Sequence, residues 1–390
     1  MKFTLWSVFS VLIVFIALLT SYPSLGQTTA DTITKKELRK QKKQYKIDQG
    51  KLLFTPLAGP AYTPEMGFTI AGGFLLSYKT NPKDSLIQRS SSPIMFGVTS
   101  TGGFFFSSIV SSYWFQDKMR IYADIWLKDM PDHYWGVGHE KAYNQTKSDS
   151  TTAYNRLWWW LNPRILWQFK PHYFIGLNVD YNFTGVSEPS KGVAEDPDII
   201  KYGQENMNSG FGIIARYDSR DVPVNAYTGT YIDFRSTFYS TAFGGDNNYQ
   251  IYQLDFRQYF KVARPGRTVA LQFKTRIGVG ELPYGEMSQL GTPFDLRGYT
   301  WGRYRDKSMI FFLGEYRHMF EKKSGDLSKH GIIAWMGTGS IAPDPSMFEN
   351  WLPNFGFGYR FEVQPRMNLR IDIGIGRETS GFYFNFNEAF

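Results

Sequence analysis

The sequence predicts an all-β protein, a single antiparallel transmembrane β-barrel of about 16 strands over residues 51–390. Three observations predict this fold class. They are the composition, an export segment at the N-terminus, and an alternation of apolar and polar residues that starts near Lys51.

The composition is that of strands with one face in lipid. The 390 residues include 33 Phe, 25 Tyr, 11 Trp and 37 Gly, and no Cys. Mean hydropathy is nevertheless negative, as expected when lipid-facing and lumen-facing residues alternate. The lack of cysteine excludes a disulfide framework, a thiolate metal site and a lipid-modified cysteine anchor.

Residues 1–26 read as a signal peptide. Lys2 precedes an apolar run from Leu5 to Leu19, and this run of about 15 residues is short for a bilayer span. Small residues at Ser24 and Gly26 suit signal peptidase and predict a mature start at Gln27. The alternative is an uncleaved anchor. A cleaved signal peptide together with a β-barrel predicts that the protein lies in the bacterial outer membrane. The lipid of that membrane is then an expected partner.

Residues 27–50 form a basic arm, which carries much of the net charge of +8. A lysine cluster before a barrel favours anionic headgroups or a periplasmic protein docking on Lys35–Lys46 over nucleic acid. Thr34 and Glu37 fit a capping box that starts a short helix, and a disordered arm is the alternative. The basic residues are Lys35, Lys36, Arg39, Lys40, Lys42, Lys43, Lys46 and Lys51, against Glu37 and Asp48.

Period-two alternation predicts the strands. It is clearest near the end, where apolar residues alternate with glycines and charges over 355–362 and 367–376. The predicted strands are 52–62, 67–79, 92–101, 104–116, 118–128, 153–168, 171–183, 208–217, 228–240, 248–260, 267–280, 307–318, 331–340, 355–363, 366–376 and 380–390.

Connection lengths predict the orientation, because bacterial barrels have short periplasmic turns and long external loops. The tight links lie near 116–117, 170–171 and 364–365, and the long segments are 129–152, 184–206, 281–306 and 341–354. We expect interfacial girdles from Trp126, Trp158, Trp159, Trp160, Tyr173 and Phe174.

The last predicted strand alternates Phe382, Phe384, Phe386 and Phe390. We interpret these four aromatics as the C-terminal signal for the barrel-insertion machinery. An exposed apolar edge would aggregate in water, so the strand should close the barrel against residues near 52–62.

Three ordered segments of the predicted barrel are more specific than its composition. The first is a periplasmic turn motif with Asp218, Arg220, Asp221 and Gly229. The second is Leu290–Tyr299 followed by Glu315, and the third is the closing strand pair with Arg370 and Asp372. Together these segments resemble the bacterial surface antigen superfamily, the barrel family of BamA and TamA, over roughly residues 51–390. The resemblance implies a long sixth external loop whose tip, Arg297-Gly298-Tyr299, folds back into the lumen.

The tip arginine then needs a partner in the lumen. Arginine can bind a carboxylate in bidentate fashion, and Gly298 permits close approach. Family members often carry an aspartate on the thirteenth strand, but 336–339 here reads Met-Gly-Thr-Gly. The candidate partners are therefore Asp372, Glu362 and Glu315. A surface arginine on a mobile loop is the alternative.

The sequence offers no enzyme or cofactor motif. His133, His139 and Glu140 share one loop but form no closed metal set, so no metal or cofactor is expected. Serines lack a G-x-S-x-G context. The resemblance implies outer-membrane protein or lipid assembly or translocation. The residues between Gln27 and Lys51 are too few for the family's periplasmic POTRA domains, which favours an accessory, partner-dependent role. A passive channel or structural barrel is the alternative, and an enzyme is a third class.

Overall fold

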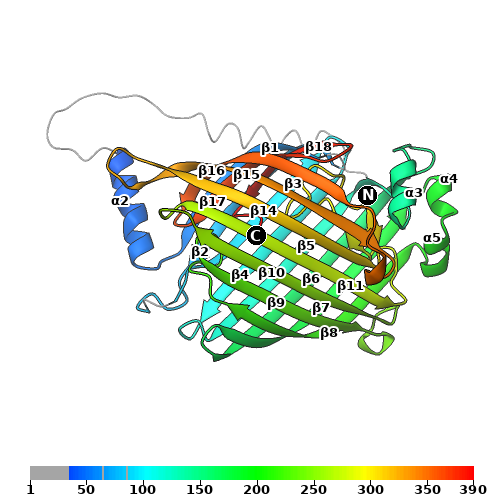
Figure 1. Ribbon diagram of the computed structural model, residues 1–390, viewed down its shortest axis with the longest axis horizontal. Coiled ribbons are helices and arrows are strands. Elements are labelled where there is room, and N and C mark those ends of the chain that lie inside the picture. Colours follow the sequence, from blue (N-terminus) through cyan, green and yellow to red (C-terminus); the bar gives the residue numbers. More distant parts are fainter. Residues whose placement is uncertain (1–34, 64–65, 85–86) are drawn as a thin grey trace. The chain divides into compact units, whose positions relative to one another are not determined.

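The computed structural model describes residues 35–63, 66–84 and 87–390, and its strands close into one antiparallel barrel of 16 strands (Figure 1). The prediction of a 16-strand antiparallel barrel is confirmed. The predicted signal peptide, residues 27–34 of the arm and the capping residue Thr34 lie outside the described residues.

Barrel strands follow one another around the wall in chain order. They are β1 (Leu53–Thr63), β2 (Gly67–Tyr78), β3 (Ser90–Thr99), β4 (Phe104–Trp114), β5 (Met119–His133), β6 (Ala153–Lys170), β7 (Tyr173–Ser187), β8 (Glu205–Asp218), β9 (Gly229–Tyr239), β10 (Tyr249–Lys261), β11 (Arg267–Gly280), β14 (Ser308–Glu321), β15 (Leu327–Ala342), β16 (Leu352–Gln364), β17 (Met367–Ile375) and β18 (Ser380–Phe386). A separate two-stranded sheet joins β12 (Ser288–Gln289) to β13 (Arg305–Asp306).

Short helices occupy the connections and the basic arm. The arm forms α2 (Lys35–Asp48), so a helix is present where one was expected. The chain divides into two compact units, residues 1–45 and 46–390, and the barrel belongs to the second. Among the described residues no helix has the length and apolarity of a membrane span. The other helices are α3 (His139–Asn144), α4 (Lys191–Ala194), α5 (Pro197–Tyr202), η1 (Thr241–Phe243) and η2 (Pro345–Met347).

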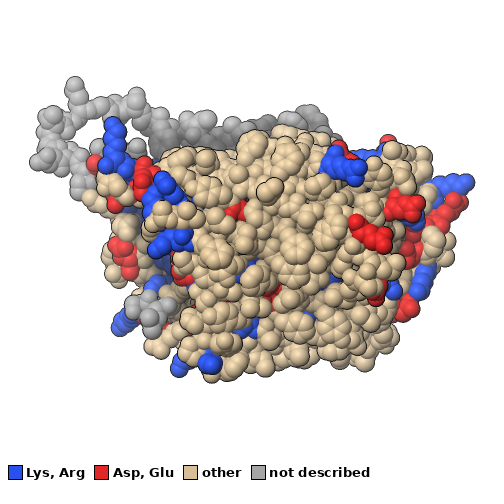
Figure 2. Space-filling model, viewed as in Figure 1, with Lys and Arg blue, Asp and Glu red and all other residues tan. Residues whose placement is uncertain are grey.

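Alternation along each strand separates a lipid face from a lumen face. In β16, Phe355 and Phe357 are 55% and 56% exposed, whereas Asn354 and Arg360 are nearly fully buried. Uncharged residues cover most of the wall seen in Figure 2. Such a band is what lipid contact requires, since charges in the hydrocarbon are costly.

The two ends of the barrel differ as the sequence predicts. The tight connections at 115–118, 171–172 and 365–366 share one end, which we call the turn end. The long connections 134–152, 188–204, 281–307 and 343–351 share the other, the loop end. Two turn-end connections, 79–89 and 219–228, are longer than the others at that end.

Two predictions need correction. The last strand does not reach Phe390: β18 ends at Phe386, Asn387 has a positive φ, and residues 387–390 turn into the lumen. We call these four residues the C-terminal tail. The expected aromatic girdle is also wrong for most of its members. Trp126, Trp158, Trp160 and Phe174 face the lumen, because each shares strand parity with buried polar neighbours, while Trp159 and Tyr173 face outward.

Candidate functional site

The connection from β11 to β14, residues 281–307, lies inside the barrel. Leu290, Leu296 and Tyr304 are fully buried and pack with lumen-facing residues of β14 and β15. A tight turn shapes its tip, because the Asp295 carboxylate accepts hydrogen bonds from the backbone N–H groups of Gly291 and Thr292, both at 2.8 Å. Burial raises the pKa of Asp295, although these hydrogen bonds favour its charged form.

At the tip, Arg297 is fully buried between two carboxylates. Its Nη1 donates to Asp372 Oδ2 at 2.7 Å, and its Nη2 donates to Glu315. The guanidinium also lies 3.6 Å from the centre of the Trp335 ring. The structure thus places Arg297 beside two of its three candidate partners, one on β14 and one on β17.

The third candidate, Glu362, lies elsewhere. It sits at the turn end, where its carboxylate accepts a hydrogen bond from the Arg366 backbone N–H at 3.1 Å. Strand parity alone could not exclude it, because parity gives the side of the sheet but not the depth along the barrel.

Two glycines let the loop backbone touch the wall. Gly298 has φ 111°, and a Cβ there would lie 2.7 Å from the backbone of Gly374 on β17. Hydrogen bonds then fix the tip: Gly298 N–H donates to the Tyr383 hydroxyl at 2.8 Å, and Tyr299 hydroxyl donates to the Pro353 carbonyl at 2.8 Å. All three residues of the predicted Arg-Gly-Tyr motif therefore contact the wall formed by β16–β18 or β14.

The contacts of Arg297 extend to the C-terminal tail. Asp372 also accepts from Arg360 at 2.6 Å, and Arg360 donates to Glu388 of the tail at 2.8 Å. Glu315, the other carboxylate that contacts Arg297, also pairs with Arg317 at 2.9 Å. Arg317 in turn donates to the Phe390 main-chain oxygen at 2.8 Å. We call this set the charge network; its members are Arg297, Glu315, Arg317, Arg360, Asp372 and Glu388.

Charge pairing outweighs burial at the tail. Burial alone would raise the pKa of Glu388, but the guanidinium groups of Arg360 and Arg317 lower it to about 2. Glu388 is therefore ionised at neutral pH. The sequence did not point to Glu388, because that residue was predicted to lie in a strand. It also did not point to Arg360 and Arg317 as members of the site, although the alternation along their strands places both on the lumen face.

The predicted C-terminal aromatics divide between two environments. Phe382 and Phe384 lie on the outer face of β18, whereas Phe386 packs with Leu75, Met367 and other buried residues. Phe390 lies in the lumen, 6.5 Å from the Tyr259 ring. Phe390 does not share the outer face of Phe382 and Phe384, because the backbone turns at Asn387.

The junction between β1 and β18, which we call the closure junction, has little backbone pairing. Among the described residues one register pair, Tyr62 with Phe382, joins the two strands. Toward the turn end the contact passes to side chains: Phe384 packs over Gly59, and Gln364 Nε2 donates to Thr55 Oγ1 at 2.9 Å and to the Leu75 carbonyl at 3.2 Å.

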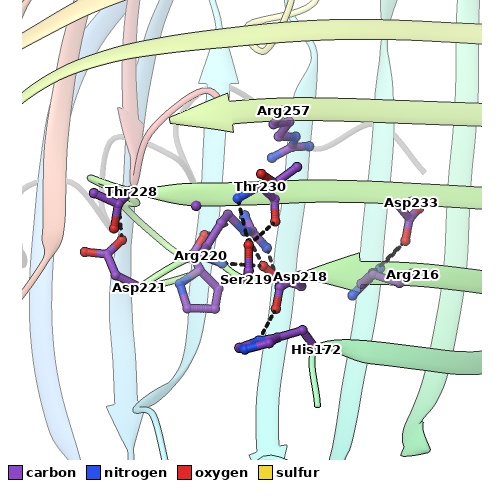
Figure 3. Close-up of polar contacts among 12 residues, drawn as sticks. His172, Arg216, Asp218, Ser219, Arg220, Asp221, Thr228, Thr230, Asp233 and Arg257 are labelled. Atoms are coloured by element: carbon purple, nitrogen blue, oxygen red, sulfur yellow. Dashed lines mark hydrogen bonds and ion pairs between the residues drawn. The ribbon is translucent and has the colours of Figure 1, made fainter. Parts of the chain in front are cut away.

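The predicted turn motif with Asp218, Arg220, Asp221 and Gly229 forms a compact ionic cluster at the end of β8. Asp218 accepts from Arg220 at 2.8 and 2.9 Å (Figure 3). It also accepts from Arg120 on β5 at 2.5 Å. Asp221 accepts from the Tyr227 N–H at 2.9 Å. Gly229 is required by its φ of 108°, since a Cβ there would lie 2.3 Å from the Ser219 carbonyl.

The same turn reaches across the turn end. Asp221 pairs with Arg366 of the β16–β17 turn at 2.9 Å, and the Arg366 guanidinium lies 3.5 Å from the Tyr227 ring centre. Gln88 donates to the Asp221 carbonyl at 3.1 Å. Residues 219–228 thus connect three turns of the barrel, which explains their length.

The described residues show no group of three or more His, Cys, Asp or Glu side chains placed to hold a metal ion. His133 contacts the Thr152 hydroxyl at 2.8 Å, and His139 stacks on Tyr304. The site is an arrangement of packed and ionic contacts that positions a loop and a strand end.

These features define a closed 16-strand β-barrel in which the long β11–β14 connection occupies the lumen. No family model matches the sequence, and no curated protein matches it. Among solved structures the chain is similar to BamA from Haemophilus ducreyi lacking POTRA domains 1–3, with TM-score 0.52 and 11% identity over 86% of this chain and 70% of that one.

Two further solved structures are CdiB from Acinetobacter baumannii (TM-score 0.52, 10% identity) and CdiB from Escherichia coli (TM-score 0.51, 8% identity). Each alignment covers 86% of this chain but only 59% and 61% of the respective CdiB chain. The fold is therefore that of the BamA and CdiB barrels, as the resemblance implied. At these identities the likeness concerns the fold alone.

Proposed function

We propose that this protein is a BamA/TamA-type barrel of the bacterial outer membrane that takes part in assembling or translocating outer-membrane proteins or lipids. In this proposal residues 1–26 direct export, and the turn end faces the periplasm. The role is non-enzymatic.

The observation that carries the proposal is the closure junction. Unpaired backbone groups on a strand edge template the addition of another strand. From Tyr62 toward the turn end, β1 has no further register partner on β18 among the described residues. An incoming strand could pair with this part of β1 by β-augmentation. The junction must open for this, and one register pair with side-chain contacts costs far less to separate than a full ladder.

The charge network supports the same role. It holds the loop tip, β14, β17 and the C-terminal tail together through buried ionic contacts. This arrangement fixes the β18 side of the junction independently of backbone pairing with β1. The junction can then separate while the wall behind it stays intact.

The basic helix α2 fits an accessory, partner-dependent role. Its residues from Lys35 to Lys46 are almost all exposed and mostly cationic. A periplasmic protein with an acidic surface, or anionic lipid headgroups, would complement it. Such a partner would capture clients for the barrel.

The test combines depletion with a trapped junction. The sequence has no cysteine, so a Y62C/F382C pair can form only its own disulfide. We expect depletion to lower the amounts of other barrels or surface proteins in outer-membrane proteomics. The reduced variant should restore them and the oxidised variant should not.

A Y62C/F68C pair between β1 and β2 is the matched control, because those residues are also register partners and both face outward. This control variant should restore the amounts of outer-membrane proteins whether it is reduced or oxidised. An unchanged proteome after depletion, or full rescue by the oxidised junction pair, would contradict the proposal.

A passive channel is the second candidate. A cavity of about 560 Å³ inside the lumen is the observation in its favour. Single-channel recording separates the two functions: a large, stable conductance with residues 281–307 intact supports the channel.

A further inference from the structure

The cavity lies between the inserted loop and the lumen face of β4–β11, and its wall changes character around the barrel. Going from β5 to β11, tryptophans are prominent on β5 and β6, amides on β7 and basic residues on β8 to β11, and Arg156 and Arg164 of β6 also line the cavity. Ligand pockets commonly measure roughly 300–1,000 Å³ and place a few polar groups among aromatic rings, and the cavity is in that range.

The aromatic part is formed by four tryptophans. Trp126 on β5 and Trp158 on β6 have ring centres 6.2 Å apart, and Trp160 follows Trp158 at 6.3 Å with a tilt of only 27°. Trp301 of the inserted loop meets Trp126 and Trp158 edge-on, both at 6.0 Å. All three strand tryptophans remain partly exposed and line the cavity, and Lys128 Nζ lies 3.2 Å from the ring centre of Trp301.

The amide part comes next on β6 and β7. Asp180 accepts hydrogen bonds from Asn162 at 2.8 Å, Trp160 at 2.9 Å and Asn182 at 3.0 Å. Asn178 is buried and lines the cavity, yet its Oδ1 has no hydrogen-bond partner among the described residues. A buried carbonyl oxygen without a donor is costly, and a ligand hydroxyl would satisfy it.

The cationic part spans β8 to β11. Arg216 and Arg235 share one carboxylate, Asp233, at 2.6 and 2.5 Å (Figure 3 shows the Arg216 contact). Lys274 lies opposite Asp255, but Arg257 and Gln272 already donate to that carboxylate. Positive charge therefore exceeds negative charge on this stretch of wall, and arginine and lysine bind carboxylate and phosphate groups well.

We propose that the cavity binds an anionic oligosaccharide. The apolar face of a sugar ring stacks on an indole, its hydroxyls pair with amides and carboxylates, and its acidic group pairs with arginine or lysine. The wall presents these three chemistries in that order on neighbouring strands. With strands about 4.8 Å apart, the span from Trp160 on β6 to Arg235 on β9 suits roughly two or three sugar rings.

The test uses the purified full barrel in detergent and three probes: the galacturonic acid trimer, the uncharged galactose trimer and triglutamate. Intrinsic tryptophan fluorescence and calorimetry measure binding. We expect the acidic sugar to bind about tenfold more tightly than either other probe, with an affinity that falls as salt is added. Equal binding of triglutamate would show a site for anions in general, and binding of none would overturn the proposal.

Matched variants distinguish stacking from charge. W158L should weaken both sugars about tenfold, whereas W159L, whose ring faces outward against Phe183, should change neither by more than about twofold. K274Q should weaken only the acidic sugar, by about fivefold, while K261Q at the exposed end of β10 should not. Unheated gel mobility verifies that each variant is folded. Equal effects of W158L and W159L, or of the two lysine variants, would refute the site.

Discussion

Strand β1 is held in different ways by its two neighbours. Toward β2 it forms a continuous ladder from Leu53 to Thr63, whereas toward β18 one register pair is formed among the described residues. The contacts that replace backbone pairing there are the packing of Phe384 over Gly59 and the hydrogen bond from Gln364 to Thr55, whereas the charge network holds the wall behind β18. The difference teaches that side chains, rather than hydrogen bonds between strands, decide how firmly this barrel closes.

The largest effect is expected from Arg297→Met, which removes the cation between Glu315 and Asp372. Breaking a fully buried ionic contact costs about 3–5 kcal/mol, because the carboxylates stay buried without their partner. Urea titration of the barrel in detergent measures the free energy of unfolding. The substitution leaves the β1–β2 ladder unchanged, so the lost free energy of unfolding would come from the contacts around β18.

Arg264→Met is the control for this change. Arg264 pairs with Glu321, whose side chain is 42% exposed, and such a pair contributes at most about 1 kcal/mol. Similar losses for the two variants would mean that burial of the charge network adds nothing.

Glu388→Gln tests the tail side of the network and adds a pH dependence. The folded pKa of about 2 lies below the ordinary value of 4.5. The ionic contact with Arg360 therefore stabilises the fold fully above pH 4.5 and is lost as the pH falls toward 2. The variant should lose about 1–3 kcal/mol at pH 7 and converge with wild type near pH 2.

The thermal midpoint as a function of pH, read from unheated gel mobility, gives this comparison. Glu349→Gln changes an exposed carboxylate in the β15–β16 connection and should follow wild type throughout. A difference between Glu388→Gln and wild type that is constant from pH 7 to pH 2 would exclude the ionic contact as its source.

Gly59→Ala should loosen the closure junction directly. A Cβ there would lie 2.8 Å from the Phe384 ring, so the ring must move, at a cost of about 1 kcal/mol. We expect slower disulfide formation in the Y62C/F382C pair. Gly314→Ala is the matched control, since its Cβ would meet Leu271 at an ordinary 3.5 Å; an equal slowing in both would contradict a local effect.

The smallest effect is expected for Arg366→Gln at the turn end. Its pair with Asp221 is partly exposed, so the loss should be about 0.5 kcal/mol. Trypsin cleavage after Arg220 should become faster, because residues 219–228 lose a contact with the β16–β17 turn. Unchanged cleavage would show that the remaining contacts of this turn suffice.

The wall was predictable because strand parity is a local property. In β16 and β17, aromatic and aliphatic residues alternate with glycines and charges, and the structure keeps this alternation. The depth of a residue along the barrel depends on register with other strands, which no single segment encodes. Hence Arg297 could be matched with lumen carboxylates, but Glu362 could not be separated from Asp372.

The tail and the tryptophans show a second limit. Phe386 and Phe390 keep the parity of β18, but Glu388 between them interrupts the apolar series, and this charge was the one local sign of the turn at Asn387. The Trp158–Trp160 run was interpreted by residue type, although parity assigns its outer two members to the lumen. Composition alone does not distinguish an interfacial girdle from a lumen wall.

The inward turn of the tail has a consequence for the order of assembly. Phe390 is 5% exposed, its main-chain oxygen accepts from Arg317, and Glu388 accepts from Arg360. These two arginines lie on β14 and β16, and the ring beside Phe390, Tyr259, lies on β10. The tail therefore reaches its final position only after strands that are distant in the chain have come together around the lumen.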